Sequence, residues 1–243
     1  MSTKTFLIGL AATAVLLSGC GTAPVAMRPD AISKIKTVAL ITVSEPQAYV
    51  ANDFGNPGVM FGAVGGIVAG ASSANAGKNI NEIAQGAGYT AGENFTRSMQ
   101  AQLIKAGYNV SVIEVLREKP GELLGSYERI DAKGADAILD LAIQSIGYAT
   151  EHPMFSPHWR PASIVNVALV DTRTREKLYS EKFMYGYHNP FMSGTDLDAP
   201  KAHHFKDKNS LFADSNKLIA GMQDSVSAVT HKVAENLSRQ DKD

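Results

Sequence analysis

Histidine and aspartate side chains near the C-terminal third are the first candidates for chemistry in this sequence. His203 and His204 are adjacent, and Asp196, Asp198 and His188 come shortly before them. Imidazole nitrogens and carboxylate oxygens are common zinc ligands. Adjacent histidines usually point apart, however, and no helical His-x-x-x-His spacing is present. We therefore interpret this segment as a solvated loop, and we expect neither a metal site nor a cofactor.

The glycine-rich segment Gly86–Gly92 (GAGYTAG) is a second candidate, because it superficially resembles a dinucleotide-binding loop. Such a loop must follow a strand and open a helix, so that the helix N-terminus meets the pyrophosphate. Residues 79–85 lack a strand pattern, which argues against that site. Gly-x-Ser-x-Gly, His-Glu-x-x-His and P-loop motifs are also absent. We expect a non-enzymatic protein; an enzyme whose site assembles only in the fold stays an alternative.

Cys20 is the only cysteine, and its surroundings carry the most specific signal. Residues 1–5 contain one positive charge, and residues 6–17 contain none. That uncharged stretch has the length of the hydrophobic region of a signal peptide and is shorter than the ~20 residues of a membrane-spanning helix. It ends in Leu17-Ser18-Gly19-Cys20, which resembles the lipobox of bacterial lipoproteins. The resemblance implies that residues 1–19 are a signal peptide and that the Cys20 sulfur carries a diacylglycerol.

The same resemblance implies where the protein resides. Cleavage before Cys20 exposes an amine that takes a further acyl chain, and two or more chains anchor a protein stably. Gly21 stands where an aspartate favours inner-membrane retention, which implies the outer membrane, facing the periplasm. The inner membrane and the cell surface are alternatives. Residues 20–35 form the lipidated N-terminus and a tether, because residues 21–33 contain two prolines and could extend ~40 Å.

Composition and pattern predict one folded domain over residues 36–243. The formal net charge of −1 lacks the basic footprint of a nucleic-acid partner, so we expect no nucleic acid. A single cysteine permits no internal disulfide bond, so the fold depends on its core. The expected class is α/β, with α+β as the alternative: a mixed β-sheet flanked by helices, with a Gly-rich helical hairpin insertion and a long C-terminal helix.

The elements behind this expectation follow from periodicity. Apolar alternation and β-branched residues predict the strands, and apolar positions at helical spacing predict the helices. In the last helix these positions include Leu218, Met222 and Val226. The expected strands are 36–44, 109–115, 135–148, 163–171 and 177–187, and the expected helices are 84–106, 120–133 and 209–239.

These elements resemble those of periplasmic α/β lipoproteins of the curli-secretion type. The shared features are the lipobox, an early KTVALITV strand, a helix ending in KAGYNV, and a GADAILDLAI strand followed by a hairpin. The resemblance implies an exported α/β domain, and the glycine-rich segment departs from it.

Residues 56–92 are the most unusual part of the chain. Gly58, Gly62, Gly66 and Gly70 recur every four residues, which places them on one helix face. Each interior glycine costs a helix ~1 kcal/mol, a loss that close backbone packing can offset. The stripe resembles the glycine zippers of bacterial envelope proteins.

A second small-residue stripe, Ala84, Gly88 and Gly92, predicts a helical hairpin with its turn at residues 72–78. A flexible loop and membrane insertion are the alternatives. Insertion would need bilayer thinning or oligomerisation, because residues 58–74 span only ~25 Å as a helix.

Two segments with aromatic residues are candidate binding surfaces. Residues 150–162 carry Met154, Phe155, Trp159 and Arg160 among prolines, and residues 188–209 add further aromatics. Aromatic and arginine side chains in stiffened loops are typical of interface hot spots. The alternative is that they fold back over the sheet. Tyr179, Phe183, Tyr185 and Tyr187 alternate along one strand and so share a face, which either packs under a helix or stacks a ligand.

The sequence thus favours a membrane-anchored, non-enzymatic envelope lipoprotein that binds or positions another envelope component. The alternative is an oligomeric membrane-inserting or secretion/pore-forming lipoprotein that uses the Gly58–Gly70 stripe. The expected partners are the membrane, through the N-terminal lipid, and either another envelope protein or further copies of this chain.

Overall fold

The computed structural model describes residues 24–26, 29–52, 71–152, 156–187 and 193–238 of the chain. None of the helices in these ranges combines the length and hydropathy needed to cross a membrane. The predicted lipidation site, the glycine stripe and some candidate binding or metal-ligating residues lie outside the described residues: Cys20, Gly58, Gly62, Gly66, Gly70, Met154, Phe155 and His188.

The centre of the fold is a mixed seven-stranded sheet with the order β3-β1-β4-β5-β6-β7, and β2 also pairs with β4. Strands β3, β1 and β4 are parallel, whereas β4, β5 and β6 form an antiparallel meander; β2 and β7 each run parallel to their neighbour. This confirms the predicted mixed sheet. The strands are β1 Thr37–Ile41, β2 Val50–Asn52, β3 Asn109–Ile113, β4 Ala137–His152, β5 Ser156–Asp171, β6 Lys177–Tyr185 and β7 Thr195–Leu197.

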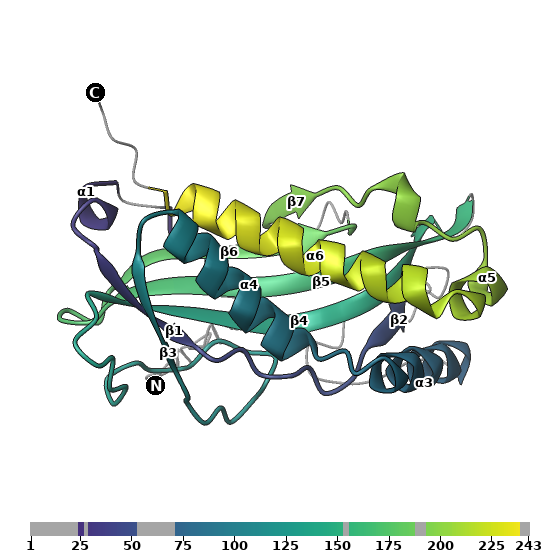
Figure 1. The fold of residues 1–243 in the computed structure, drawn as a ribbon, viewed down its shortest axis with the longest axis horizontal. Coiled ribbons are helices and arrows are strands. Elements are labelled where there is room, and N and C mark those ends of the chain that lie inside the picture. Colours follow the sequence, from purple (N-terminus) through teal and green to yellow (C-terminus); the bar gives the residue numbers. More distant parts are fainter. Residues whose placement is uncertain (1–23, 27–28, 53–70, 153–155, 188–192, 239–243) are drawn as a thin grey trace, which may run out of the picture.

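Helices α4 and α6 lie side by side across one face of the sheet (Figure 1). Alternate residues of β4, such as Leu139 and Leu141, point toward them and are fully buried. Phe95 of α4 and Met222 of α6 complete this core. The amphipathic patterns of both helices are therefore confirmed. The helices are α1 Pro29–Ile32, α3 Ala71–Gly86, α4 Ala91–Lys105, the 3-10 turn η1 Lys201–His203, α5 Lys208–Ala213 and α6 Ser215–Asn236.

The aromatic strand β6 packs under α6, which is the first of the two arrangements that its pattern predicts. Tyr179, Phe183 and Tyr185 are buried in the helix-side core. The Tyr185 hydroxyl donates a hydrogen bond to Asp224 of α6, and burial is the largest cause that raises its pKa.

The predicted C-terminal helix over 209–239 is divided in two by Asp214. The side chain of Asp214 accepts a hydrogen bond from Lys217 N at 2.9 Å, which caps the start of α6. Because Asp214 itself has a non-helical backbone, α5 ends before it.

The helix predicted for residues 120–133 is wrong: residues 114–136 form turns and irregular structure that cover part of the sheet face opposite α4 and α6. Tyr127 and Ala132 from this segment pack with Ile41, Ile113 and Ile138 in a second, smaller core. Glycines at 121 and 125 disfavour a helix, and the Leu124 N–H, which a helix would use internally, is bound to a side chain of the sheet.

The predicted hairpin turn at residues 72–78 is also wrong, because these residues lie inside α3. The chain breaks instead after Gly86, where Gly88 adopts a φ of +61°. A positive φ at a glycine is a common helix stop. The second stripe is therefore split: Ala84 lies on α3 and Gly92 on α4.

The described parts of the segment predicted as a loop, residues 150–152 and 156–162, are strand. β4 continues to His152, β5 begins at Ser156, and Trp159 pairs with Thr150. Proline disfavours a strand where its missing N–H would join a ladder. The Trp159 N–H points away from β4, to Phe205 O at 2.7 Å, and Pro161, two positions later, has the same parity. The missing N–H of Pro161 would face that same side, before β5 begins to pair with β6 at Ser163, so no ladder hydrogen bond is lost there.

Candidate functional site

Trp159, a predicted partner-binding residue, is a core side chain that is only 5% exposed. Its backbone exchanges two hydrogen bonds of 2.7 Å with Phe205, whose ring meets Tyr148 edge-on at 5.5 Å. Arg160 is half-buried beside it on β5. The structure thus brings the two aromatic segments together at Trp159 and Phe205, but as packing that joins η1 and α5 to the sheet.

Those candidate metal ligands that the structure describes do not come together. Asp196 is on β7 and His203 is in η1, and the His204 Nε2 lies 3.1 Å from Ala199 O. Among the described residues, no three histidine, cysteine or acidic side chains come close enough together to hold an ion.

The glycine-rich segment 86–92 does not form a nucleotide loop, because it follows helix α3 rather than a strand. The N-terminus of α4, where a phosphate would bind, is occupied by a carboxylate of the chain itself. Glu45 accepts hydrogen bonds from Ala91 N at 3.0 Å and Gly92 N at 2.7 Å. Gly92 permits this approach, since a Cβ there would lie 2.5 Å from Val43 O.

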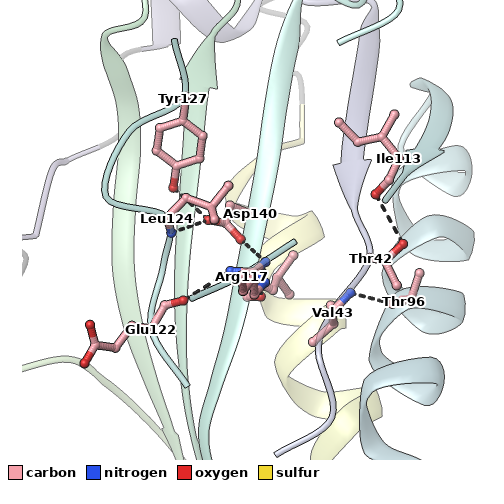
Figure 2. A network of polar contacts seen from close by, with 10 residues as sticks. Thr42, Val43, Thr96, Ile113, Arg117, Glu122, Leu124, Tyr127 and Asp140 are labelled. Carbon is pink, nitrogen blue, oxygen red and sulfur yellow. Dashed lines mark hydrogen bonds and ion pairs between the residues drawn. The ribbon is translucent and has the colours of Figure 1, made fainter. Parts of the chain in front are cut away.

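A buried ion pair, Arg117–Asp140, is the centre of the polar network on the opposite sheet face (Figure 2). Asp140 projects from β4 with no exposed surface, and the Arg117 side chain is 2% exposed. Arg117 also donates to Leu141 O at 3.1 Å and to Glu122 O at 3.1 Å. A buried carboxylate is stable only with such partners.

Asp140 fixes the irregular segment to the sheet. Besides the arginine, its carboxylate accepts hydrogen bonds from Leu124 N at 3.0 Å and from the Tyr127 hydroxyl at 2.8 Å. The pKa of Tyr127 is raised, first by burial and then by the charge of Asp140. The network therefore determines where residues 114–136 lie, although none of them is in a helix or strand.

An open groove with a volume of about 640 Å³ lies between the end of β3 and this segment. One wall is Val112–Leu116, and the other consists of residues 129–131 and 133. Leu116 is 97% exposed, and among the described residues only Ile104 is a comparably exposed large apolar side chain, at 54%. The groove also carries both signs of charge, from Glu114, Asp131, Arg129 and Lys133.

The groove borders an open edge of the sheet. Within the described residues, β3 pairs only with β1, from Thr37–Asn109 to Ile41–Ile113 without a register shift. An edge strand presents unpaired backbone groups and is a template for another strand. We call the groove and this edge together the β3-edge site. This site combines an exposed leucine, an open groove and an open strand edge in one part of the described surface.

The sequence does not predict this site. Leu116 and Ile130 have no periodic pattern, and nothing in the sequence marks β3 as an outer strand. One signal was available for the network that shapes the site: Asp140 interrupts the apolar run AILDLAI, and a charge in a buried strand requires a partner.

Comparison with known proteins gave no match to a family model and none to a curated protein. Solved structures do match. A PelC dodecamer from Paraburkholderia phytofirmans is 12% identical over 90% of this chain and 96% of that chain, with a TM-score of 0.39. A neuraminyllactose-binding hemagglutinin homolog from Helicobacter pylori is 12% identical over 86% of each chain, with a TM-score of 0.37.

Proposed function

We propose that this chain is a lipid-anchored envelope lipoprotein that binds or positions another envelope protein at the β3-edge site, without catalysis. The observation that carries the proposal is the exposed Leu116 beside an unpaired sheet edge. Among the described residues β3 has no second neighbour, and an edge strand with unpaired backbone groups is a template for pairing with another chain; the exposed leucine beside it adds apolar surface for that contact.

The hydrogen bonds of three carboxylates support a binding role over an enzymatic one. Glu45 is used to cap α4, and Asp140 is used to hold residues 114–136. Asp136 likewise binds the start of β1, where its carboxylate accepts from Lys36 N at 2.8 Å and Thr37 N at 2.9 Å. Each of these carboxylates is engaged in holding the fold together.

The anchor is the part of the proposal that rests on the lipobox resemblance at Cys20. We expect the outer membrane as its location, with residues 20–35 as the tether. Replacing residues 1–20 with a conventionally cleaved secretory signal removes the acylated cysteine. The protein should then become soluble in the periplasm and stay soluble after an alkaline wash.

Retention in the membrane after that wash would instead favour the membrane-inserting alternative. In that case the Gly58–Gly70 stripe would be embedded, and Gly62→Leu should change the oligomeric state.

The binding role is tested by placing a photo-crosslinking amino acid at Leu116 in the full chain in intact cells. We expect an adduct with one envelope protein. The control is the same probe at Ile104, an exposed apolar position on α4. No adduct from position 116, or the same products from both positions, would refute a specific binding site in the groove.

A further inference from the structure

We propose that the β3-edge site takes an extended segment of the partner protein as an additional β-strand paired with β3. The inference rests on the proposed function and specifies the chemistry of recognition. The segment binds through its backbone, and its side chains reach the groove formed by Val112–Leu116 and by residues 129–131 and 133.

The direction of the backbone groups of β3 follows from its bonds to β1. Asn109 N donates to Lys36 O at 2.9 Å, and Ile113 O accepts from Thr42 N at 2.9 Å. In a parallel ladder, residues of one parity bond to the same neighbour. The N–H and C=O groups of the other parity, at Val110 and Val112, therefore point to the open edge.

These outward groups define the occupant. Two donors and two acceptors that recur at every second residue match the repeat of an extended chain, about 6.6 Å. A helix cannot pair with them, because its own backbone groups are bonded internally. Only another strand can form hydrogen bonds with all the outward N–H and C=O groups of Val110 and Val112. This mode of recognition is strand addition to a sheet edge.

The outer strands of the sheet differ in how they are protected. Natural edges are kept free by short strands, charges, prolines or bulges. Within the described residues β2 pairs only with β4 and β7 only with β6; each has three residues, and β7 contains Asp196. β3 (NVSVI) has five residues, no charge, no proline and no bulge in its pairing with β1. β3 is therefore the outer strand with the least protection against pairing with an added strand.

The groove indicates the side chains of the incoming strand. Leu116, Val115 and Ile130 form its apolar part, and Ile130 also packs against the smaller core. Acidic Glu114 and Asp131 lie with basic Arg129 and Lys133 around it. We therefore expect a segment with an apolar residue over Leu116, flanked by charged residues of both signs.

The test combines the Leu116 crosslink with two variants of the same residue in the full-length lipoprotein in cells. Val112→Pro removes the outward N–H but none of the bonds to β1, and an edge strand tolerates proline at such a position. Val112→Ala is the matched control, because it truncates the side chain and keeps the N–H. We expect the adduct to fall about ten-fold or more in the proline variant, because its pairing group is left unsatisfied, and no more than about three-fold in the alanine variant.

The outcomes of the crosslinking experiment separate the binding role, the strand pairing and the identity of the partner. No adduct from the unmutated β3 would overturn the proposed binding at this site as well as the inference. An adduct that survives Val112→Pro in a protein with unchanged thermal unfolding would leave the binding role intact and overturn strand pairing. An adduct between two copies of this chain would overturn the assignment to a different envelope protein.

A second measurement covers the case in which the proline variant does not fold. The crosslinked segment is mapped by mass spectrometry and synthesised as a peptide. Amide hydrogen exchange is then measured on the unmutated lipoprotein in detergent micelles, with and without the peptide. The Val110 and Val112 amides should slow at least about ten-fold when the peptide is added, and unchanged exchange there would refute strand addition.

Discussion

The buried Arg117–Asp140 pair predicts a strong and non-additive effect on stability. Arg117→Met leaves the Asp140 carboxylate buried without its cation, and Asp140→Asn leaves the guanidinium buried without its anion. Removing one partner of a buried pair costs about 3–5 kcal/mol. For a domain of this size, that corresponds to a fall in Tm of roughly 6–20 °C.

The double variant separates pairing from packing. In Arg117→Met/Asp140→Asn no charge is left unpaired, and the asparagine oxygen still accepts from Leu124 N and the Tyr127 hydroxyl. We therefore expect the double variant to lose at least about 2 kcal/mol less than the sum of the single losses, within the usual range for residues in contact.

These losses are measured by urea unfolding, which is monitored by the fluorescence of Trp159. Trp159 is the only tryptophan of the chain and is buried. Lys119→Met is the control, because its pair with Glu122 in the same segment is exposed, and such pairs contribute about 0–1 kcal/mol. A coupling below about 0.5 kcal/mol, the level of independent sites, would refute the argument that this pair holds the groove wall to the sheet.

Two further predictions follow from the fold. Gly92→Ala should lower the free energy of unfolding by about 1–3 kcal/mol, because its Cβ would press on the Val43–Glu45 backbone. Gly86→Ala is the control and should not destabilise the protein, because there is open space around Gly86. Equal urea midpoints for the two variants would contradict this prediction. The pKa of Asp136 is lowered by hydrogen bonds from Lys36 N and then Thr37 N, so its stabilising effect is complete above about pH 4 and is lost as the pH falls through the lowered value. The difference in Tm between the unmutated protein and Asp136→Asn should therefore shrink between pH 7 and pH 2, and a constant difference would contradict it.

The sheet and its covering helices could be predicted because their signals are local. Leu139 and Leu141 alternate along β4, and Phe95 and Met99 recur at helical spacing along α4. Either pattern buries one face of its own element. The class of the fold, the long final helix and the packing of the aromatic strand β6 under α6 follow from such patterns.

The errors lie where distant contacts override local preference. Residues 120–133 fail to form a helix because Asp140, on another element, binds the Leu124 N–H. Trp159 lies in a strand rather than a loop because its backbone pairs with Thr150 of β4 and with Phe205, 46 positions along the chain. The β3-edge site was missed for the same reason, since an edge is a property of the whole sheet. Gly58 and Cys20 lie outside the described residues, so their predicted roles stay predictions.

The strand order also determines which strands can pair first when this protein folds. The β4–β5–β6 meander closes through short connections, but β1 must pair with β4, and Thr37 lies 99 positions before its hydrogen-bond partner Asp136. Chains emerge N-terminus first, at about 5–20 residues per second. At that rate β4 is made roughly 5–20 s after β1, and β3 is made in between. Until both are present the apolar β1 has no partner in the sheet, so a chaperone that keeps the exported chain unfolded until β4 is available should raise the yield of folded protein.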